Sequence, residues 1–424
     1  MKKLVINIKI ILIIVFFPVF LLLSEKSHAQ IIESPESIFV KKVEAILLNS
    51  CLRKKNFGVK IHSLERDKTL YSVYSDRLFS PASNLKLLTT AVALKRLGAN
   101  YRFKTALYAT LPIVGKILEG DIYIKGFGDP NLVSEQMWLL ANELKNTPLK
   151  KVRGNIIADA SFFDSNQRVK TWNKKAGVEA YNAPLGALSF NFNTVAVHVT
   201  PGEKKGDRPI VVVDPDIEFI RVDNRARTAS KPKYGRLIVN RVDRGDHNVI
   251  TVSGTMPVNS RRETYYLNIT QPTHYAAIVF KEYLLQAGVE VMGKVRVGSV
   301  PEGAYELFSH ESIPLSLILR GLNKFSNNFV AEQILKTIAA EIYGEPGTTL
   351  NGLRAMDEYM QSLQYKAEEF SILDGSGLSR ESQLSPDQIV SVLQDIYKDL
   401  GVYPEFISAL GVMGRDGNVL KRMK

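Results

Sequence analysis

Strand-like patterns fill residues 101–300 of the 424-residue sequence and separate a short helical segment from a longer helical block. Short apolar runs bounded by turn residues recur at 103–108, 122–124, 155–158, 195–199, 210–213, 237–239, 249–252 and 265–269. Helical patterns at 135–145 and 275–286 are the exceptions. We therefore expect one or two β-rich domains inserted into a domain whose helical parts lie far apart in the sequence but fold together.

The segments on either side of this middle part predict an α+β domain. Two short strands are expected at 58–63 and 70–74, and a helix follows from residue 83. After residue 312 helical patterns occupy 315–322, 329–342, 350–363, 386–400 and 405–410. We interpret 30–98 with 305–424 as one discontinuous domain and 99–304 as the insertion.

Ser83 and Lys86 lie three residues apart at the start of the early helix. Residues with this spacing share one face of a helix, so the amine of Lys86 is expected beside the hydroxyl of Ser83. A serine is a poor nucleophile at its free pKa and needs such a base. The pattern alone is weak, because serine and lysine are common. It nevertheless predicts a candidate nucleophile and its base.

Ser326 and Asn328 lie directly before a later helical pattern. Two residues apart in a loop, they can present a hydroxyl and an amide to one cleft. The hydroxyl could relay a proton between a lysine and a leaving amine. The amide could hold a substrate carbonyl or the lysine. The alternative for the same residues is an ordinary helix N-cap.

The first 29 residues predict a secretory signal peptide. The first nine residues hold three lysines, 14 apolar residues occupy 10–23, and 27–29 fit a small-x-small cleavage site before Gln30. An uncleaved anchor is the alternative, but spanning a bilayer takes about 20 apolar residues. We expect secretion across the inner membrane and a periplasmic or other extracytoplasmic location.

Composition excludes several classes of site. Hydrophobic residues make up 45% of the sequence, enough for a globular core. Cys51 is the only cysteine, so no internal disulfide can form. With six histidines and no paired ligand spacing, no zinc site is expected.

The formal net charge is +12, and basic residues concentrate between residues 221 and 262. They include Arg221, Arg225, Arg227, Lys231, Lys233, Arg236, Arg241, Arg244, Arg261 and Arg262. The export signal argues against a nucleic-acid partner. Peripheral contact with an anionic wall polymer or membrane surface is physically sensible. A solvated basic surface without a partner is the interpretation we favour.

Ser83-x-x-Lys86 and Ser326-x-Asn328 resemble the first two motifs of the D-alanyl-D-alanine carboxypeptidase/endopeptidases of the penicillin-binding protein 4 type, peptidase family S13. Further stretches similar to this family are Gly126-Phe-Gly-Asp-Pro-Asn-Leu132, Tyr181-Asn-Ala-Pro-Leu-Gly-Ala-Leu-Ser-Phe-Asn-Phe-Asn193, Asp374-Gly-Ser-Gly-Leu-Ser-Arg380 and Met413-Gly-Arg-Asp-Gly417. The separation of 243 positions in the sequence between Ser83 and Ser326 is similar to the long separation in the family, which inserted domains fill. In a compact serine β-lactamase far fewer residues separate the two corresponding motifs.

The resemblance implies a β-lactamase/transpeptidase-like α/β sandwich domain with two inserted β-rich domains, and a serine D,D-peptidase acting on peptidoglycan stem peptides. By the same resemblance, Ser83 attacks the D-Ala–D-Ala carbonyl. Lys86, held neutral by burial and neighbouring positive charge, accepts the proton of Ser83. Ser326 passes a proton to the leaving amine, and Asn328 orients the substrate and the lysine. β-Lactams are expected to acylate Ser83, and no cofactor or metal is implied.

The family's third motif, Lys-Thr-Gly on a strand lining the active site, does not occur in this sequence. The Lys-Thr pairs at 104, 170 and 336 are followed by Ala, Trp and Ile. We expect that the sequence stops shortly before this motif and lacks the domain's C-terminal strands. In the family, a backbone N–H just after this motif forms half of the oxyanion hole, and the loss of one such donor costs about 10²–10³ in rate. The alternative is a non-catalytic peptidoglycan-binding or scaffold relative. A β-lactamase would need a deacylating base, for which the sequence offers no candidate.

Several other conspicuous residues are expected to have no catalytic role. We interpret 374–380 as a structural loop near the site, so Ser376 and Ser379 are not candidate nucleophiles. His274 is assigned no function, and Trp138 and Trp172 are expected to pack against neighbouring residues. The oligomeric state is left open.

Overall fold

The computed structural model describes residues 34–49, 56–172, 177–230 and 236–422. The expected signal peptide at 1–29 and Cys51 lie outside these ranges. Helix α1 (Pro35–Asn49) belongs to one compact unit and Asn56–Lys424 form a second. Within the described ranges, no helix is both long and apolar enough to cross a membrane.

A hairpin and the helix next to Ser83 open the second unit. These elements are β1 (Val59–Ser63), β2 (Lys68–Val73), a 3-10 turn (Ala82–Asn84) and α2 (Leu85–Leu97). The helix forms because Leu88 and Val92, one turn apart, are buried on one face. It ends at Gly98, whose φ of 84° an L side chain rarely adopts.

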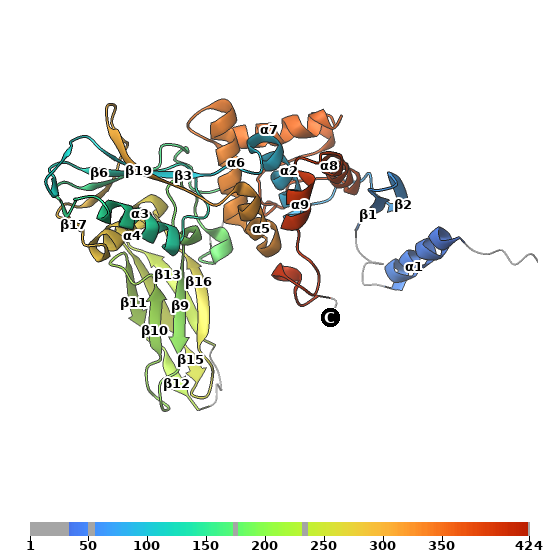
Figure 1. Cartoon of the computed structure of the whole chain (residues 1–424). Coiled ribbons are helices and arrows are strands. Elements are labelled where there is room, and N and C mark those ends of the chain that lie inside the picture. The colour runs from blue at the N-terminus through green and yellow to red at the C-terminus, as the bar shows by residue number, and fades with distance from the viewer. Residues whose placement is uncertain (1–33, 50–55, 173–176, 231–235, 423–424) are drawn as a thin grey trace, which may run out of the picture. The chain divides into compact units, whose positions relative to one another are not determined.

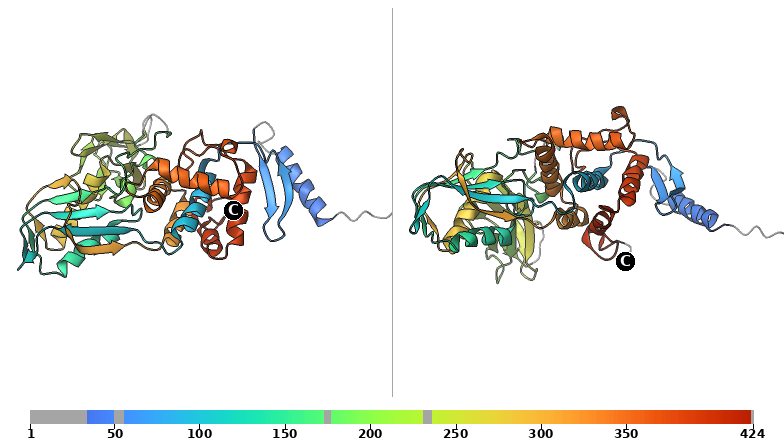
Figure 2. Two further views of the ribbon diagram at one scale, coloured as in Figure 1. Left: turned by 90° about the horizontal axis from the view of Figure 1, so that it is seen from above. Right: turned by 45° about the horizontal axis from the view of Figure 1, so that its top comes forward.

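Helices from the C-terminal part of the sequence gather around α2 (Figure 1). They are α5 (Leu315–Phe325), α6 (Asn328–Tyr343), α7 (Thr349–Ser362), α8 (Pro386–Lys398) and α9 (Tyr403–Ala409). Each of them contacts α2, and both views in Figure 2 show the blue α2 among the orange and red helices. Leu85 and Leu94 of α2 share one hydrophobic core with Leu319, Ile334 and Met356.

The first part of the β-rich middle consists of a five-stranded sheet in the order β18-β8-β6-β3-β19 and a four-stranded sheet in the order β17-β7-β5-β4. The strands are β3 (Lys104–Ala109), β4 (Ile113–Val114), β5 (Ile117–Leu118), β6 (Ile122–Gly126), β7 (Lys151–Val152), β8 (Ile156–Asp159), β17 (Glu290–Val291), β18 (Val295–Val297) and β19 (Tyr305–Glu311). Helices α3 (Ser134–Lys145) and α4 (Pro272–Gln286) contact each other and the five-stranded sheet. Their apolar side chains complete the core of this part.

The second part is a group of smaller sheets in the orders β10-β9-β16, β11-β14-β13 and β12-β15. The strands are β9 (Thr194–Thr200), β10 (Ile210–Asp214), β11 (Ile220–Asn224), β12 (Arg227–Ala229), β13 (Ile238–Asp243), β14 (Asn248–Ser253), β15 (Thr255–Pro257) and β16 (Glu263–Asn268). In β9, Val195, Val197 and Val199 are buried and alternate with more exposed residues, as expected for a strand with one face on a core. Figure 1 shows this group as a lobe that extends away from α3 and α4.

One strand pair brings the two ends of the β-rich middle together. β19 pairs antiparallel with β3, so that Glu311 lies opposite Lys104. The chain therefore leaves and re-enters the helical block at neighbouring points, although more than 200 residues intervene. This closure allows α2 and the late helices to share one core.

The expected helices and strands are confirmed to within a few residues at their ends. Nine strands of the described ranges were not expected. They are the two- and three-residue strands β4, β5, β7, β12, β15, β17 and β18, and the longer β11 and β19, in which charged residues such as Arg221 and Glu306 interrupt the apolar alternation. The domain boundaries, 30–98 with 305–424 and 99–304, stay a prediction.

Helix α5 provides a test of the shared core. Leu319 is fully buried, whereas Leu317 on the same helix is 41% exposed. We expect Leu319→Ala to lower the free energy of unfolding by about 2–5 kcal/mol, because it leaves a cavity. Urea denaturation followed by circular dichroism measures this loss. Leu317→Ala is the matched control, and an equal loss in both variants would contradict the packing described here.

Candidate active site

Ser83 and Lys86 lie side by side at the start of α2, as the sequence predicts. Ser83 occupies the 3-10 turn Ala82–Asn84 and is exposed, whereas the Lys86 side chain is almost fully buried in the first turn of α2. The Lys86 Nζ is 3.4 Å from the Ser83 Oγ, within hydrogen-bond reach. A solvent-accessible hydroxyl is thereby paired with an amine that is shielded from water.

Ser326 and Asn328 reach the same place from the junction of α5 and α6. Ser326 ends α5 with a φ of 55°, in the left-handed region, and its Oγ donates a hydrogen bond of 2.8 Å to the Ser83 Oγ. Asn328 begins α6 and accepts a hydrogen bond of 2.8 Å from the Lys86 Nζ. All four residues singled out in the sequence therefore form one connected cluster.

The side chains of Ser326 and Asn328 do not serve as the N-cap of α6. The residue between them, Asn327, is the N-cap of α6, and its side chain accepts a hydrogen bond from the Val330 N–H. The Ser326 hydroxyl faces Ser83 instead, and the Asn328 amide faces Lys86 on one side and the Tyr181 carbonyl on the other, at 3.2 Å. The N-cap interpretation of the Ser-x-Asn pattern is thus wrong for these two side chains.

The loop 374–379 supplies a third hydrogen-bond partner for the Lys86 amine, which side-chain patterns did not reveal. The backbone carbonyl of Ser376 accepts a hydrogen bond of 2.5 Å from the Lys86 Nζ. The Ser376 hydroxyl donates to Asp374, and the N–H groups of Gly377 and Ser379 also donate to the Asp374 carboxylate. The loop is therefore structural, as expected, but its backbone contacts the candidate base directly.

Trp172 packs as expected, and two side chains near the loop 374–379 add contacts that the sequence did not reveal. Trp172 packs in the core, and its indole Nε1 also donates a hydrogen bond of 3.0 Å to Asp374. Glu332, which the sequence analysis did not single out, is fully buried on α6 and accepts a hydrogen bond from the Gly375 N–H. Its spacing of four residues from Asn328, on one helical face, is the signal that could have identified it.

Burial lowers the pKa of Lys86 to about 8, because a charged amine loses solvation inside the protein. Glu332 and Asp374 act in the opposite direction and raise the pKa of Lys86. The expectation of neighbouring positive charge is therefore wrong: the charges that act on this amine are carboxyl groups. A substantial fraction of Lys86 is neutral near pH 8 and can accept a proton from Ser83.

A cleft opens beside this cluster. It is lined by Thr171, Gly177, Glu179, Tyr181, Asn182, Leu378, Arg380 and Glu381. Tyr181 is the residue whose carbonyl meets Asn328, and Leu378 belongs to the loop that contacts Lys86. Ser83, Lys86, Ser326 and Asn328 do not line this cleft themselves, but its charged and apolar side chains can accept a substrate with polar groups near Asn328.

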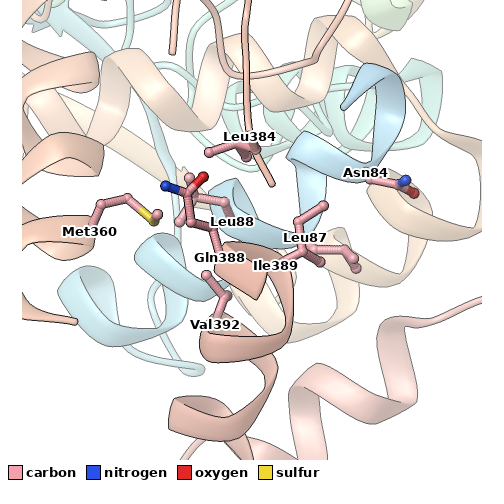
Figure 3. A pocket seen from close by; sticks show the side chains of 8 residues that line it. All are labelled: Asn84, Leu87, Leu88, Met360, Leu384, Gln388, Ile389 and Val392. Carbon is pink, nitrogen blue, oxygen red and sulfur yellow. The ribbon is translucent and has the colours of Figure 1, made fainter. Parts of the chain in front are cut away.

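A smaller hollow against α2 is unsuited to the chemistry. Leu87 and Leu88 of α2, Met360 of α7, and Ile389 and Val392 of α8 line it, together with Asn84, Leu384 and Gln388 (Figure 3). Its wall is almost entirely apolar. Asn84 is the neighbour of Ser83 in sequence, but Ser83, Lys86, Ser326 and Asn328 are not among the lining residues.

Residues 39–424 match the family model described as the D-Ala-D-Ala carboxypeptidase 3 (S13) family. A D-alanyl-D-alanine carboxypeptidase of Actinomadura sp. (strain R39) is 33% identical over 380 residues, which cover 88% of this chain and 69% of that relative. The resemblance stated from the sequence motifs is thereby confirmed.

Two crystal structures share the fold. Penicillin binding protein 4 (dacB) from Haemophilus influenzae matches with a TM-score of 0.76 and 25% identity, over 87% of this chain and 80% of that one. The same protein in complex with a novel β-lactam matches with a TM-score of 0.69 and 24% identity, over 87% and 79%. The expected α+β fold, a transpeptidase-like domain with inserted β-rich domains, is confirmed by this likeness.

Gly377 tests how closely the 374–379 loop approaches the turn that carries Ser83. Its φ is 74°, and an added Cβ would lie 1.8 Å from the backbone oxygen of Ala82. We expect Gly377→Ala to lower the melting temperature strongly, because strain and a backbone clash combine. Gly98→Ala is the matched control, since φ is 84° there but nothing lies within 4 Å of the added Cβ. Equal melting temperatures of the two variants would contradict the close approach.

Proposed function

This chain belongs to the D-Ala-D-Ala carboxypeptidase 3 (S13) family, and we infer that it is a serine-type D-Ala-D-Ala carboxypeptidase acting on the stem peptides of peptidoglycan. The observation that carries this proposal is the connected cluster of Ser83, Lys86, Ser326 and Asn328. An exposed hydroxyl beside a buried amine is the arrangement that acyl transfer through a serine requires.

Acylation begins with Ser83 as the nucleophile. Its Oγ attacks the carbonyl carbon of the D-Ala–D-Ala amide, while neutral Lys86 accepts the hydroxyl proton. The Nζ–Oγ separation of 3.4 Å is close enough for this transfer. The products of the first step are a tetrahedral intermediate and a protonated lysine.

Ser326 and Asn328 then serve the collapse of the intermediate. The Ser326 hydroxyl, 2.8 Å from the Ser83 Oγ, delivers a proton to the departing amine of the terminal D-Ala and is reprotonated from Lys86. Asn328 keeps the Lys86 Nζ in place through its Oδ1, which is 2.8 Å away. Water then hydrolyses the ester on Ser83, which releases the shortened peptide and restores the serine.

β-Lactams are the expected acylating inhibitors of the same serine. The related Haemophilus influenzae protein is known in complex with a β-lactam. In this chain the cleft lies beside Asn328, because Tyr181, whose carbonyl accepts a hydrogen bond from the Asn328 amide, is one of its lining residues. A β-lactam therefore serves as a probe of the serine that does not depend on the native cross-link chemistry.

The proposed substrate also indicates where the protein acts and which surfaces it meets there. Stem peptides lie outside the cytoplasmic membrane, so the signal peptide proposed at 1–29 would deliver the enzyme to them. Arg221, Arg227 and Arg236, in or next to β11, β12 and β13, are exposed and would favour peripheral contact with anionic wall or membrane surfaces. Arg241 is an exception, since it is partly buried and donates a hydrogen bond to Asn268.

Incubation of residues 30–424 with benzylpenicillin, followed by intact-mass measurement, tests the proposal. We expect one covalent adduct on the wild-type chain and none on Ser83→Ala, because Ser83 is the acylated residue. Release of the terminal D-Ala from a stem pentapeptide is then measured with the same two proteins.

The alternative, a non-catalytic peptidoglycan-binding or scaffold relative, makes the opposite prediction. A chain that unfolds cooperatively yet forms no adduct would support that alternative and overturn the enzymatic proposal. Rapid turnover of benzylpenicillin instead of a stable adduct would indicate a β-lactamase.

The pH dependence of acylation tests the role of Lys86. The pKa of about 8 means that the protonated, inactive form dominates at lower pH. We expect the acylation rate to rise about tenfold for each pH unit well below 8 and to level off above it. Stopped-flow measurements with a fluorescent penicillin give this profile. A rate independent of pH in the same range would contradict Lys86 as the base.

A further inference from the structure

Glu332 and Asp374 form a buried acidic pair next to the candidate base. Both side chains are fully buried. Glu332 lies on α6, one turn beyond Asn328, and Asp374 begins the loop 374–379 whose Ser376 carbonyl contacts Lys86. The proposed mechanism assigns neither of them a role, yet both act on the pKa of Lys86.

The two carboxyl groups differ sharply in their hydrogen-bond donors. Asp374 accepts hydrogen bonds from the Trp172 Nε1, the Ser376 hydroxyl and the N–H groups of Gly377 and Ser379. Donors of this number stabilise a carboxylate even when it is buried. Asp374 is therefore the group of the pair that is built to carry a negative charge.

Glu332 has far fewer partners. Its Oε1 accepts one hydrogen bond of 2.9 Å, from the Gly375 N–H, and its Oε2 is buried without a partner among the described residues. An ionised carboxylate with an unsatisfied buried oxygen is costly. Burial and the nearby Asp374 raise the pKa of Glu332 to about 8, although Ser376, Gly375 and Lys86 act in the opposite direction. The neutral acid is the favoured form below this pH.

A short chain of contacts connects Glu332 to the reactive serine. The Glu332 Oε1 accepts a hydrogen bond from the Gly375 N–H. The carbonyl of the next residue, Ser376, accepts a hydrogen bond from the Lys86 Nζ. The Gly375 carbonyl in turn accepts a hydrogen bond from the Thr89 hydroxyl on α2. The loop is thus fastened to α6 and α2 on either side of the amine.

We propose that Glu332 is a positioning residue for acylation, which fastens the 374–379 loop against Lys86 and holds a proton there, so that the amine faces one buried negative charge instead of two. This inference rests on the proposed function of Ser83 and Lys86 and deepens it. The proton on Glu332 weakens the attraction that would otherwise keep Lys86 charged. Asn328 and Glu332, on one face of α6, act together on the amine.

Two variants, Glu332→Gln and Glu332→Ala, test separately the charge state of Glu332 and its hydrogen bond from the Gly375 N–H. Glutamine keeps an oxygen for the Gly375 N–H and matches the neutral form of Glu332, because neither side chain carries a charge. We expect the pH–acylation profile of Glu332→Gln to stay close to that of the wild type below about pH 8. Glu332→Ala releases the loop, and we expect its plateau rate to fall by about 10²-fold, since misplacement of a reacting group by about 1 Å costs that much. Glutamine should rescue most of this loss.

Thr337→Val is the matched control for packing on α6. Thr337 is fully buried, and its hydroxyl donates only to the Gln333 carbonyl one turn earlier. We expect this variant to lower stability without moving the pH profile. Fluorescent penicillin and stopped-flow kinetics provide the profiles for all variants, and thermal unfolding shows that each is folded.

Two outcomes would overturn the proposal. A midpoint of the Glu332→Gln profile at clearly lower pH than in the wild type would mean that wild-type Glu332 is ionised and raises the pKa of Lys86. A loss of rate in Glu332→Gln as large as in Glu332→Ala would mean that the negative charge itself is needed. Neither outcome affects the Ser83 adduct of the wild-type chain, so the proposed function is judged separately.

Infrared difference spectroscopy provides a measurement that is independent of catalysis. A protonated buried carboxyl group gives a C=O stretch that ionised carboxylates lack. We expect this band at neutral pH in the difference between the wild-type and Glu332→Gln spectra, which removes the contribution of other carboxyl groups such as the buried Asp129, and its loss from that difference as the pH rises above about 8. A difference spectrum without the band at neutral pH would refute the protonated state even if no variant could be acylated.

Discussion

The burial of a single amine, that of Lys86, is the interaction on which the arrangement of the site depends. Its Nζ joins the start of α2 to Asn328, 242 residues later, and to the Ser376 carbonyl, 290 residues later. A lysine amine removed from water needs such acceptors, because an unpaired buried charge would cost several kcal/mol, about the size of a large mutational effect. The requirement to provide hydrogen-bond acceptors for this amine therefore holds α2, α6 and the loop 374–379 in one arrangement.

The long insertion is compatible with that geometry because its two ends meet. The antiparallel pairing of β3 with β19 returns the chain to the place that it left, and α2 can then pack with α5 and α6 as if the sequence were continuous. The insertion also contributes to the site. Tyr181 lends its carbonyl to Asn328, and Trp172 donates to Asp374. The β-rich middle therefore forms one wall of the cleft as well as the connection between the two helical parts.

Electrostatics in this site result from a balance between burial and nearby acids. Burial alone would push the lysine towards its neutral form, and the two carboxyl groups oppose this. The donors around Asp374 fix its charge, whereas Glu332 lacks such donors. The pKa of the amine lies at about 8 because burial outweighs the opposing effect of the two carboxyl groups. The sequence analysis expected a positive neighbour, since a motif shows which residue types are present but not which of them share a buried space.

The sequence by itself determined the local structure and the reactive pair. Apolar spacing in α2 and α5, alternation in β9 and the three-residue step from Ser83 to Lys86 each act over one or two turns, so neighbouring residues suffice to specify them. The second motif was also readable, because Ser326 and Asn328 match a family pattern. Only the tertiary structure decided that Asn327, and not its neighbours, caps α6, that a backbone carbonyl of Ser376 completes the amine's partners, and that Glu332 lies beside them. These features depend on contacts between segments far apart in the chain and on backbone atoms, which every residue carries and no side-chain pattern can reveal.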